Sequence, residues 1–366
     1  MTAVRIANTP LPPLVGVDSR GLRAMAKQLG EAEYRGTQIA DWVYRKRVQR
    51  FEEMTNLPAR LRIGLAERFR ISALTHVSTQ VSTDGVTKLL LNTSRGEGIE
   101  AVALETDDWV SSCVSSQVGC PMRCTFCATG LGGYTTNLTA GEIVDQILHL
   151  QRVTGKRVDH VGVMGMGEPL LNLDAVLAAL RIAHEELGIS YRKMHVSTVG
   201  IVPKIRELAE ADLPINLAIS LHSPTDSVRE RLMPVNRKWP VHELVLAARE
   251  YVQKTGRKVT FEYLMIAGEN DTLEQARRLA SLVKGFPCLV NLIPFNYVDT
   301  GHGYRRPDSG QVHAFRAELE KHGVNVSQRK ERGHGIDAAC GQLRGRHGGK
   351  PIPLGLALSA DRSEAS

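Results

Sequence analysis

The strongest constraint on the fold is a strand–helix rhythm that begins near residue 108 and repeats six times. Apolar runs of strand length alternate with longer amphipathic stretches, which predicts an α/β fold with a parallel sheet and helices outside it. The predicted strands are residues 109–116, 158–164, 193–198, 214–220, 258–266 and 288–294. The predicted helices are one that opens at Thr139 and those at 173–186, 203–210, 241–254, 272–284 and 310–321. Six units are too few for a closed TIM-type barrel, so we expect a partial, open (β/α)6 barrel.

The segments around this barrel give the expected domain boundaries. Residues 1–18 suggest a flexible leader, and residues 19–107 suggest a small accessory domain of helices followed by short strands. The barrel would take residues 108–343, including a last strand at about 323–328. Residues 344–366 mix Gly, Pro and Ser with few aromatic residues, which predicts a flexible tail.

The composition is that of a globular protein. The chain has 366 residues, of which 42% are hydrophobic, enough for a substantial core. No apolar stretch approaches the length of a membrane span, and the first residues lack the apolar region of a signal peptide. Six cysteines, three of them in one short loop, argue against a disulfide scaffold and for a reducing compartment such as the cytoplasm.

The three clustered cysteines are Cys120, Cys124 and Cys127, in a C-x3-C-x2-C run. Four cysteines normally close a cubane iron–sulfur cluster, so a loop with three leaves one iron without a protein ligand. An open coordination position is what catalysis at a metal requires. A structural zinc knuckle is the alternative, but zinc sites favour C-x2-C pairs and four protein ligands. The spacing therefore predicts an open [4Fe-4S] cluster.

Basic residues are concentrated in two stretches, residues 34–50 and 329–346, within a chain of net charge +7. The first stretch interleaves basic and aromatic residues, namely Tyr34, Arg35, Trp42, Tyr44, Arg45, Lys46, Arg47, Arg50 and the following Phe51. Basic side chains neutralise phosphates, and aromatic faces stack on unpaired bases. Each stretch alone fits a solvated helix face with aromatic anchors in the core. Both together, beside the cysteine loop, favour a polyanion such as RNA as the partner.

Small polar residues follow several predicted strands, at the end where barrels place their chemistry. Gly167 and Glu168 lie in a Gly-Met-Gly-Glu-Pro turn, where glycine lets the backbone approach a ligand and the carboxylate can accept from an ammonium group. The other residues of this kind are Ser197, Thr198, Ser220, Leu221, His222 and Asn296. Each of these residues alone is also consistent with a role in a turn or a helix cap. His222 is equally consistent with a histidine whose hydrogen bonds are all made within the protein. Their shared position favours a ligand with ribose, carboxylate or adenine groups.

Three cysteines remain outside the loop. Cys288 begins an apolar strand and is expected to be buried. Cys113 lies on the first predicted strand, and Cys340 lies in the run Ile-Asp-Ala-Ala-Cys-Gly-Gln-Leu. Arginines on both sides of Cys340 permit a lowered thiol pKa. From spacing alone, a spare thiol of this kind is usually inert.

The cysteine loop, the Gly-Met-Gly-Glu-Pro turn and the segment around Cys340 together resemble the RlmN/Cfr family of radical S-adenosylmethionine (SAM) RNA adenine methyltransferases. The resemblance runs from Tyr34 to Leu343, and the run Cys-Val-Ser-Ser-Gln-Val-Gly-Cys that begins at Cys113 is especially specific. The segments Phe51–Pro58 and Leu232–Arg237 are nearer to the RlmN branch. The sequence departs from the family's pattern at two places, which bear on which branch the chain belongs to and on which adenine carbon is methylated. Tyr297 replaces an expected proline, and Ser223-Pro224 replaces the more usual Ala-Pro.

The resemblance implies a radical SAM barrel, a cluster held by the three loop cysteines, and two SAM molecules per turnover. In the family, the cysteine matching Cys340 is methylated by one SAM. A second SAM at the cluster yields a 5′-deoxyadenosyl radical, which takes a hydrogen from that methyl group, and the carbon radical adds to adenine carbon 2. The residue matching Cys113 resolves the resulting protein–RNA crosslink, leaving a disulfide with Cys340. Glu100 matches the proton acceptor, although a surface glutamate is the alternative.

By the same matching, the resemblance implies SAM contacts at Gly167, Glu168, Ser197, Ser220, Leu221, His222 and Asn296. It implies 23S rRNA (the peptidyl-transferase region) and tRNA (the adenine beside the anticodon) as substrates, an electron donor such as flavodoxin, and a cytoplasmic monomer that needs no membrane. Two alternatives stay open. One is a Cfr-type carbon-8 methyltransferase of 23S rRNA that confers antibiotic resistance. The other is a non-enzymatic RNA-binding protein with a structural metal.

Overall fold

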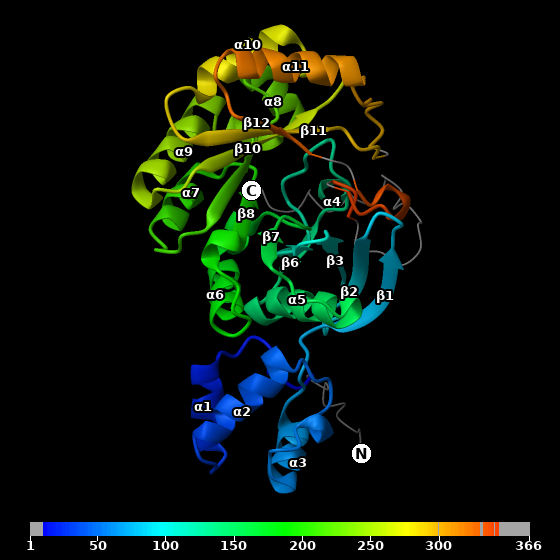
Figure 1. Ribbon diagram of the computed structural model, residues 1–366, viewed down its shortest axis with the longest axis vertical. Helices are drawn as coiled ribbons and strands as arrows, with labels where there is room; N and C mark the ends of the chain where they lie inside the picture. The colour runs from blue at the N-terminus through cyan, green and yellow to red at the C-terminus, as the bar shows by residue number, and fades with distance from the viewer. Residues whose placement is uncertain (1–9, 299, 330–331, 340, 344–366) are drawn as a thin grey trace, which may run out of the picture.

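The computed structural model describes residues 10–298, 300–329, 332–339 and 341–343. Its main feature is a ten-stranded sheet in the order β1-β2-β3-β4-β7-β8-β9-β10-β11-β12, covered by helices, with a small helical module at one end (Figure 1). The sheet begins at β1 and ends at β12 without joining them, which confirms the open α/β barrel that the sequence predicts.

Seven neighbouring strands of this sheet are parallel. They are β4 (Val110–Val114), β7 (His160–Val163), β8 (Met194–Thr198), β9 (Asn216–Ser220), β10 (Val259–Met265), β11 (Cys288–Pro294) and β12 (Val326–Gln328). All the strands predicted in the barrel are present, some with shorter ends. Their carboxyl ends lie at one edge of the sheet, which is where parallel α/β sheets bind ligands.

The predicted barrel helices are also present: α5 (Ala140–Thr154), α6 (Leu173–Glu185), α7 (Val202–Ala209), α9 (Val241–Thr255), α10 (Leu273–Val283) and α11 (Ser309–Lys321). The start of α5 shows why the sequence forms it there. Thr139 Oγ1 accepts a hydrogen bond from Glu142 N at 3.2 Å, and the Glu142 carboxylate accepts one from Thr139 N at 2.8 Å. This reciprocal capping box fixes the first turn. None of the helices in the described ranges is long and apolar enough to cross a membrane.

Three short elements surround the cysteine loop, and the sequence did not predict them. The strands β5 (Gln117–Gly119) and β6 (Tyr134–Asn137) form an antiparallel pair, and α4 (Ala128–Leu131) lies between them in the chain. A further short helix, α8 (Asp226–Leu232), follows β9. These elements are too short to give a periodic sequence pattern.

Residues 75–105 form three antiparallel strands, β1 (Thr75–Val81), β2 (Val86–Asn92) and β3 (Gly98–Glu105). Because β3 pairs with β4, these strands extend the barrel sheet. Cys113 of β4 lies opposite Val102 of β3 and Gly162 of β7, so strands on both sides fix its position.

The N-terminal module contains α1 (Ser19–Gln28), α2 (Tyr34–Ala40), a π-helical turn (Asp41–Arg45), a 3₁₀ turn (Phe51–Glu53) and α3 (Ala59–Arg68). It lies beside α5 at the lower end of the molecule in Figure 1. The predicted leader is described only from residue 10. There Leu14 and Val15 are buried, and Leu14 N donates to Arg70 O at 2.8 Å, so this part of the leader packs into the module. The predicted tail, residues 344–366, lies outside the described residues.

Candidate active site

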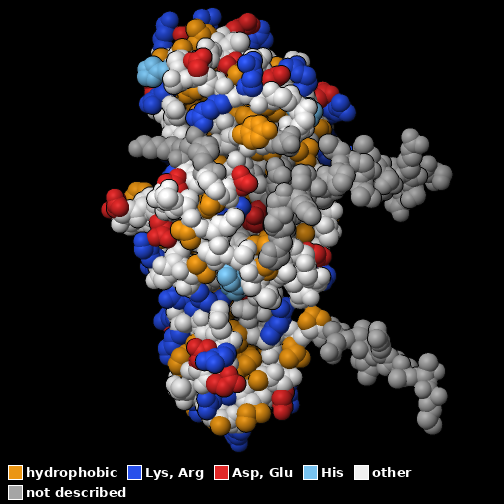
Figure 2. Space-filling model, turned by 90° about the vertical axis from the view of Figure 1, so that its right-hand side faces the viewer, with side chains coloured by type: hydrophobic (Ala, Val, Ile, Leu, Met, Phe, Trp, Pro, Cys, Tyr) orange, Lys and Arg blue, Asp and Glu red, His pale blue; other side chains and the backbone are white. Residues whose placement is uncertain are grey.

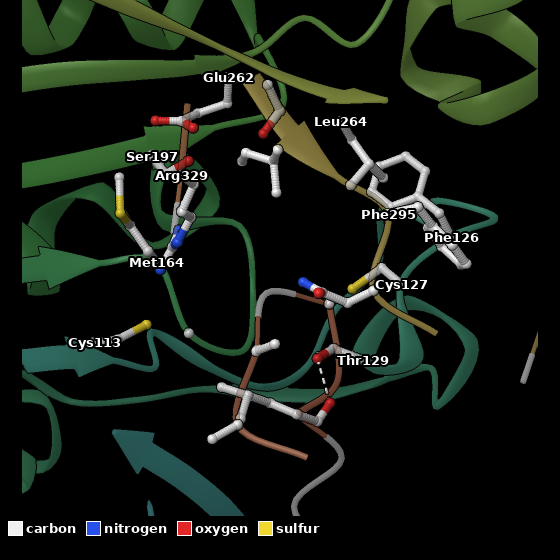
Figure 3. A pocket seen from close by; sticks show the side chains of 18 of the residues that line it. Cys113, Phe126, Cys127, Thr129, Met164, Ser197, Glu262, Leu264, Phe295 and Arg329 are labelled. Atoms are coloured by element: carbon white, nitrogen blue, oxygen red, sulfur yellow. Dashed lines mark hydrogen bonds between the residues drawn. The ribbon is translucent and has the colours of Figure 1, made fainter. Parts of the chain in front are cut away.

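The site is a pocket at the carboxyl ends of the barrel strands. Strand-end residues that line it are Cys113, Met164, Ser197, Ser220, His222, Glu262 and Asn296. The cysteine loop and α4 contribute Phe126, Cys127 and Thr129, and the C-terminal segment contributes Ala338, Ala339, Gly341 and Leu343. In the view of Figure 3, Cys113 and Cys127 lie on opposite sides of this space. The pocket therefore brings together three sets of residues that are far apart in the sequence.

The cysteine loop is held rigidly from both sides. Thr125 N donates to Leu232 O at 3.0 Å, and Thr125 Oγ1 lies 2.8 Å from the Tyr304 hydroxyl. At the start of the loop, a Cβ added to Gly119 would lie 2.0 Å from Gly133 O, so only glycine fits there. These contacts hold the loop at the pocket.

The loop's three thiols have the chemistry of iron–sulfur ligands, although no three His, Cys, Asp or Glu side chains of the described residues are placed to hold a single metal ion. Cys120 and Cys124 are buried, whereas Cys127 is half-buried and lines the pocket. Burial raises the pKa of Cys120 to about 12 and the pKa of Cys124 well above its usual range. Such thiols lose their protons when a cationic metal centre binds and compensates the buried charge. Three of them on one loop, beside an open pocket, fit a [4Fe-4S] cluster with one iron left for a ligand.

Glu168 is 1% exposed and lies in the wall behind the pocket lining. One carboxylate oxygen accepts from Val199 N at 2.8 Å and the other from Leu170 N at 3.0 Å. Burial raises the pKa of Glu168 to about 7, and three hydrogen bonds to the carboxylate have the smaller, opposite effect. The preceding Gly167 has φ +102°, and a Cβ there would lie 2.6 Å from Gln117 Cβ. The turn thus holds a buried carboxylate next to the pocket lining, and its role as a ligand contact stays a prediction.

His222 lies on the pocket wall with its backbone in the left-handed region, at φ 55°. Its Nδ1 accepts from Leu264 N at 3.0 Å, so in the neutral ring the proton is on Nε2. Burial, and secondly the charge of Arg229, lower the pKa of His222 to about 3. The ring therefore stays neutral at physiological pH and offers Nε2–H as a donor. The histidine is thus satisfied at Nδ1 and lines the pocket, and its contact with a ligand stays a prediction.

Asn296 supplies the clearest sign of a ligand. Its side chain is 6% exposed, and its Oδ1 has no hydrogen-bond partner within the described part of the chain. A buried acceptor of this kind needs a donor from a bound molecule or from water. Ser197 and Ser220 line the same pocket, whereas Leu221 is fully buried behind it.

Cys340 itself lies outside the described residues, but the residues on both sides of it are described. Ala339 and Gly341 line the pocket, and Gly341 O accepts from Ala128 N at 2.8 Å. Leu343 O accepts from Thr129 Oγ1 at 2.6 Å, the bond drawn in Figure 3. The segment that carries Cys340 is thus bonded to α4, next to the cysteine loop.

Glu100 is 5% exposed, so it is not the surface glutamate that the sequence left open. Its Oε1 lies 3.2 Å from Lys88 Nζ, and both side chains are buried. The same Nζ donates to Asp337 O at 3.2 Å. Glu100 is not among the pocket-lining residues, but Lys88 connects it to the segment that carries Cys340.

Among the charged residues that the sequence analysis did not single out are the half-buried Glu262 and the fully buried Arg229. Glu262 of β10 lines the pocket, burial raises its pKa, and Asn291 Nδ2 donates to it at 2.8 Å. A single carboxylate inside an apolar strand was the signal that could have found it. Arg229 of α8 is fully buried. It stands in a run of charged residues that is typical of a solvated helix, so no local signal distinguished it.

The aromatic residues of the first basic stretch have different environments. Tyr44 is buried, and its hydroxyl donates to Val17 O at 2.8 Å, which makes it a core anchor. Tyr34 is 56% exposed, and Lys46 Nζ lies 3.5 Å from the centre of the half-buried Trp42 ring. Figure 2 shows Lys and Arg side chains gathered where the module meets the barrel. Tyr34 and Trp42 thus remain accessible to a polyanion, whereas Tyr44 does not.

Comparison with known proteins gives two domain matches. The Radical SAM superfamily model matches residues 114–280, and the model of the ribosomal RNA large subunit methyltransferase N-terminal domain matches residues 13–71. The second match includes the buried residues Leu14 and Val15.

Similar proteins cover almost the whole chain. A probable dual-specificity RNA methyltransferase RlmN from Geobacillus kaustophilus is 47% identical over 342 residues, which cover 92% of this chain and 93% of that protein. One from Symbiobacterium thermophilum is 48% identical over 349 residues, 94% of each. The crystal structure of a radical SAM methyltransferase from Sphaerobacter thermophilus has a TM-score of 0.88 and 41% identity, covering 92% of this chain and all of that one.

Proposed function

Since this chain belongs to the RlmN family of radical SAM methyltransferases, we propose that it methylates carbon 2 of a specific adenine in 23S rRNA and of the adenine beside the anticodon in tRNA. The observation that carries this proposal is the shared pocket, where the cysteine loop, the polar strand ends and the neighbours of Cys340 meet. The term dual-specificity in the relatives' names supports two RNA substrates.

The residues present fit the two cofactors of the family. Cys120, Cys124 and Cys127 would hold the cluster, which when bound supplies the electron that turns SAM into a source of a carbon radical. Among the described residues, Asn296 Oδ1 is a buried acceptor in need of a donor, and His222 lines the pocket and would offer Nε2–H as a donor. Glu168 would accept from the SAM ammonium group, which favours the ionised carboxylate.

Other SAM contacts would come from the strand ends around these residues, namely Gly167, Ser197, Ser220 and Leu221. We propose that SAM lies across these ends, because Ser197 and Ser220 line the pocket from neighbouring strands. Gly167 would let the backbone approach the ligand, as its φ of +102° requires glycine. Leu221 is buried and would contribute through its backbone.

The remaining groups would handle the methyl group and the RNA. Cys340 would carry the methyl group as a thioether, and Cys113, across the pocket from Cys127, would resolve the crosslink and end in a disulfide with Cys340. Glu100 would accept a proton from the adenine adduct. It is buried against Lys88, which bonds the C-terminal segment at Asp337 O.

We also propose the setting of the reaction. Residues 19–107 would contact RNA through the basic face of the helical module, and residues 108–343 would carry the chemistry together with Glu100 of β3. The protein would work as a monomer in the cytoplasm, where a reducing environment protects the cluster and a donor such as flavodoxin reduces it. The family membership does not favour a carbon-8 methyltransferase or a non-enzymatic RNA-binding protein.

Nucleoside mass spectrometry tests the proposal. Anaerobically reconstituted, reduced protein is incubated with methyl-labelled SAM and unmodified 23S rRNA or tRNA, and the digested nucleosides are separated. Labelled 2-methyladenosine from both RNAs is the expected result. Labelled 8-methyladenosine would move the protein to the other branch, and SAM cleavage without any labelled adenosine would mean that the substrate is wrong.

A further inference from the structure

Arg229 is the largest fully buried side chain of the described residues, and none of the chemistry above uses it. It lies on α8, between the ends of the barrel strands and the cysteine loop. An arginine is almost never fully buried unless its guanidinium group is fully engaged. The full burial of Arg229 therefore indicates that its guanidinium group has a specific role.

The guanidinium group binds the ends of two neighbouring strands. Its Nη2 donates to Val199 O at 2.6 Å and to Ser220 O at 3.2 Å, and its Nε donates to Leu221 O at 3.1 Å. Its Nη1 donates to Asn236 Oδ1 at 2.9 Å, which fixes the plane of the group. One side chain thus bonds three main-chain carbonyls directly after β8 and at the end of β9.

These carbonyls belong to the residues that shape the proposed SAM site. The N–H of Val199 donates to Glu168, so Val199 is held between that carboxylate and Arg229. Ser220 and Leu221 directly precede His222, whose backbone lies in the left-handed region. The bonds from Arg229 to the carbonyls of Ser220 and Leu221 therefore also fix the chain where it enters this conformation. A lysine has no planar fork and cannot bind these diverging carbonyls together.

The other side of α8 faces the cysteine loop. Leu232 O accepts from Thr125 N at 3.0 Å, and Leu232 and Met233 pack in one hydrophobic cluster with Cys124. Arg229 lies three residues before Leu232 on α8, so its buried guanidinium group is carried by the helix that packs against Cys124. Burial lowers the pKa of Arg229 itself only to about 10, so it stays charged at neutral pH.

We propose that Arg229 is a positioning residue with two effects, which rest on the proposed function. Its hydrogen bonds hold the strand ends that contact SAM, and its charge raises the reduction potential of a cluster bound through Cys124. One-electron reduction adds a negative charge to the cluster. A buried cation near one ligand stabilises this charge, because the low dielectric of the interior screens it little.

The test separates the hydrogen bonds from the charge. Full-length wild type, Arg229→Lys and Arg229→Gln are reconstituted anaerobically, without RNA. The cluster's midpoint potential is measured without SAM, by dithionite titration followed by electron paramagnetic resonance. SAM affinity is measured by isothermal titration calorimetry. Arg231→Gln is the matched control, because Arg231 lies on the same helix but is exposed and paired with Glu269 at 2.9 Å.

We expect Arg229→Lys to keep a potential near that of wild type and to bind SAM roughly tenfold more weakly, about the effect of losing one charged hydrogen bond. Arg229→Gln should lose SAM affinity and also shift the potential to a more negative value. Arg231→Gln should change neither quantity.

An unchanged potential in Arg229→Gln, or a clearly lowered one in Arg229→Lys, would overturn the charge effect. Wild-type SAM affinity in Arg229→Lys would overturn the effect on the strand ends. If Arg229→Gln takes up no cluster, Arg229→Lys still tests both effects. A merely structural role would lower the melting temperature and leave the potential of the folded protein unchanged. Failure of wild type itself to bind a cluster and SAM would contradict the proposed function instead.

Discussion

The cysteine loop and the segment that carries Cys340 meet at one pocket but are held in different ways. The loop between Cys120 and Cys127 is enclosed by the core, with two buried thiols and contacts to α8 and Tyr304. The C-terminal segment, described at residues 332–339 and 341–343, lies over β2 and the β1–β2 turn. Leu343 packs into the core and two further hydrogen bonds join the segment to α4, but much of it is held by separate polar contacts. These join Gly333 N to Asp84 Oδ2 (2.7 Å), Lys88 Nζ to Asp337 O (3.2 Å) and Gln342 Nε2 to Tyr297 O (3.0 Å).

The difference matches what each segment has to do in the proposed reaction. Ligands of a cluster have to keep their geometry, and packing into the core provides this at every step. A residue that carries a methyl group has to meet one SAM, then another, and then the RNA base. A segment that packs less completely into the core is easier to displace than the enclosed loop.

The largest expected effect separates the two segments by function. Cys124→Ala should prevent cluster binding, so both SAM cleavage and RNA methylation should fall by several orders of magnitude. Cys340→Ala should keep SAM cleavage but stop RNA methylation, because no sulfur remains to carry the methyl group. Both products, 5′-deoxyadenosine and methyladenosine, are measured by mass spectrometry in one reaction.

Cys288→Ala is the matched control for these variants, since its half-buried thiol lies at the start of β11 and does not line the pocket. It should retain both activities. RNA methylation that persists in Cys340→Ala would mean that the C-terminal segment does not carry the methyl group, and the contrast between the two segments would lose its functional meaning.

A second prediction concerns the release of the RNA. Cys113→Ala should trap the protein on the RNA, because the thiol that resolves the crosslink is missing from the pocket. A slowly migrating species that contains RNA should appear on a denaturing gel, and it should require Cys340. Turnover to free methylated RNA without such a species would show that Cys113 does not resolve the crosslink.

The third prediction tests how the C-terminal segment is held. Lys88→Met removes the buried cation that faces Glu100 and the donor to Asp337 O. Breaking a buried pair by removing one partner should lower the free energy of unfolding by about 4 kcal/mol. Chemical denaturation measures this loss.

The double variant with Glu100→Gln should recover part of the stability, because the buried carboxylate is then neutral as well. Strictly additive losses in this double-mutant cycle would contradict a direct interaction between Lys88 and Glu100. The segment would then be held by its other contacts.

The smallest expected effect is a pH dependence at Glu168. Its pKa is about 7 in the folded chain against a usual value of 4.5, so the folded state keeps the proton to a higher pH. The stability from this proton is complete below pH 4.5 and is lost as the pH rises through about 7. The loss should reach about 3 kcal/mol for a buried group.

Denaturation of the ligand-free protein between pH 5 and pH 8 should show this decline in wild type, and Glu168→Gln should flatten it. Saturating SAM should restore stability at the upper end of the range, because the ammonium group favours the ionised carboxylate. Parallel curves for wild type and Glu168→Gln would show that the Glu168 proton has no part in stability.

The fold and the cysteine loop could be predicted because their signals are local. Strand and helix periodicity, the capping box at Thr139 and the spacing of the three loop cysteines each lie within one short run of residues. Every barrel strand was therefore expected close to its observed place. The strand-end polar residues were also predictable, since parallel strands in sequence bring their carboxyl ends to one edge.

The tertiary structure alone decided which of these residues share the pocket and what surrounds them. Lys88 bonds to Asp337, 249 residues away, and Arg229 bonds to Val199, 30 residues away. Burial made Tyr44 a core anchor and left Asn296 Oδ1 in need of a donor within the described chain. The sequence by itself determined the sheet, its helices and the cysteine loop, because periodicity and spacing are short-range. Burial, charge pairing and hydrogen-bond satisfaction depend on contacts between distant segments, which only the folded chain defines.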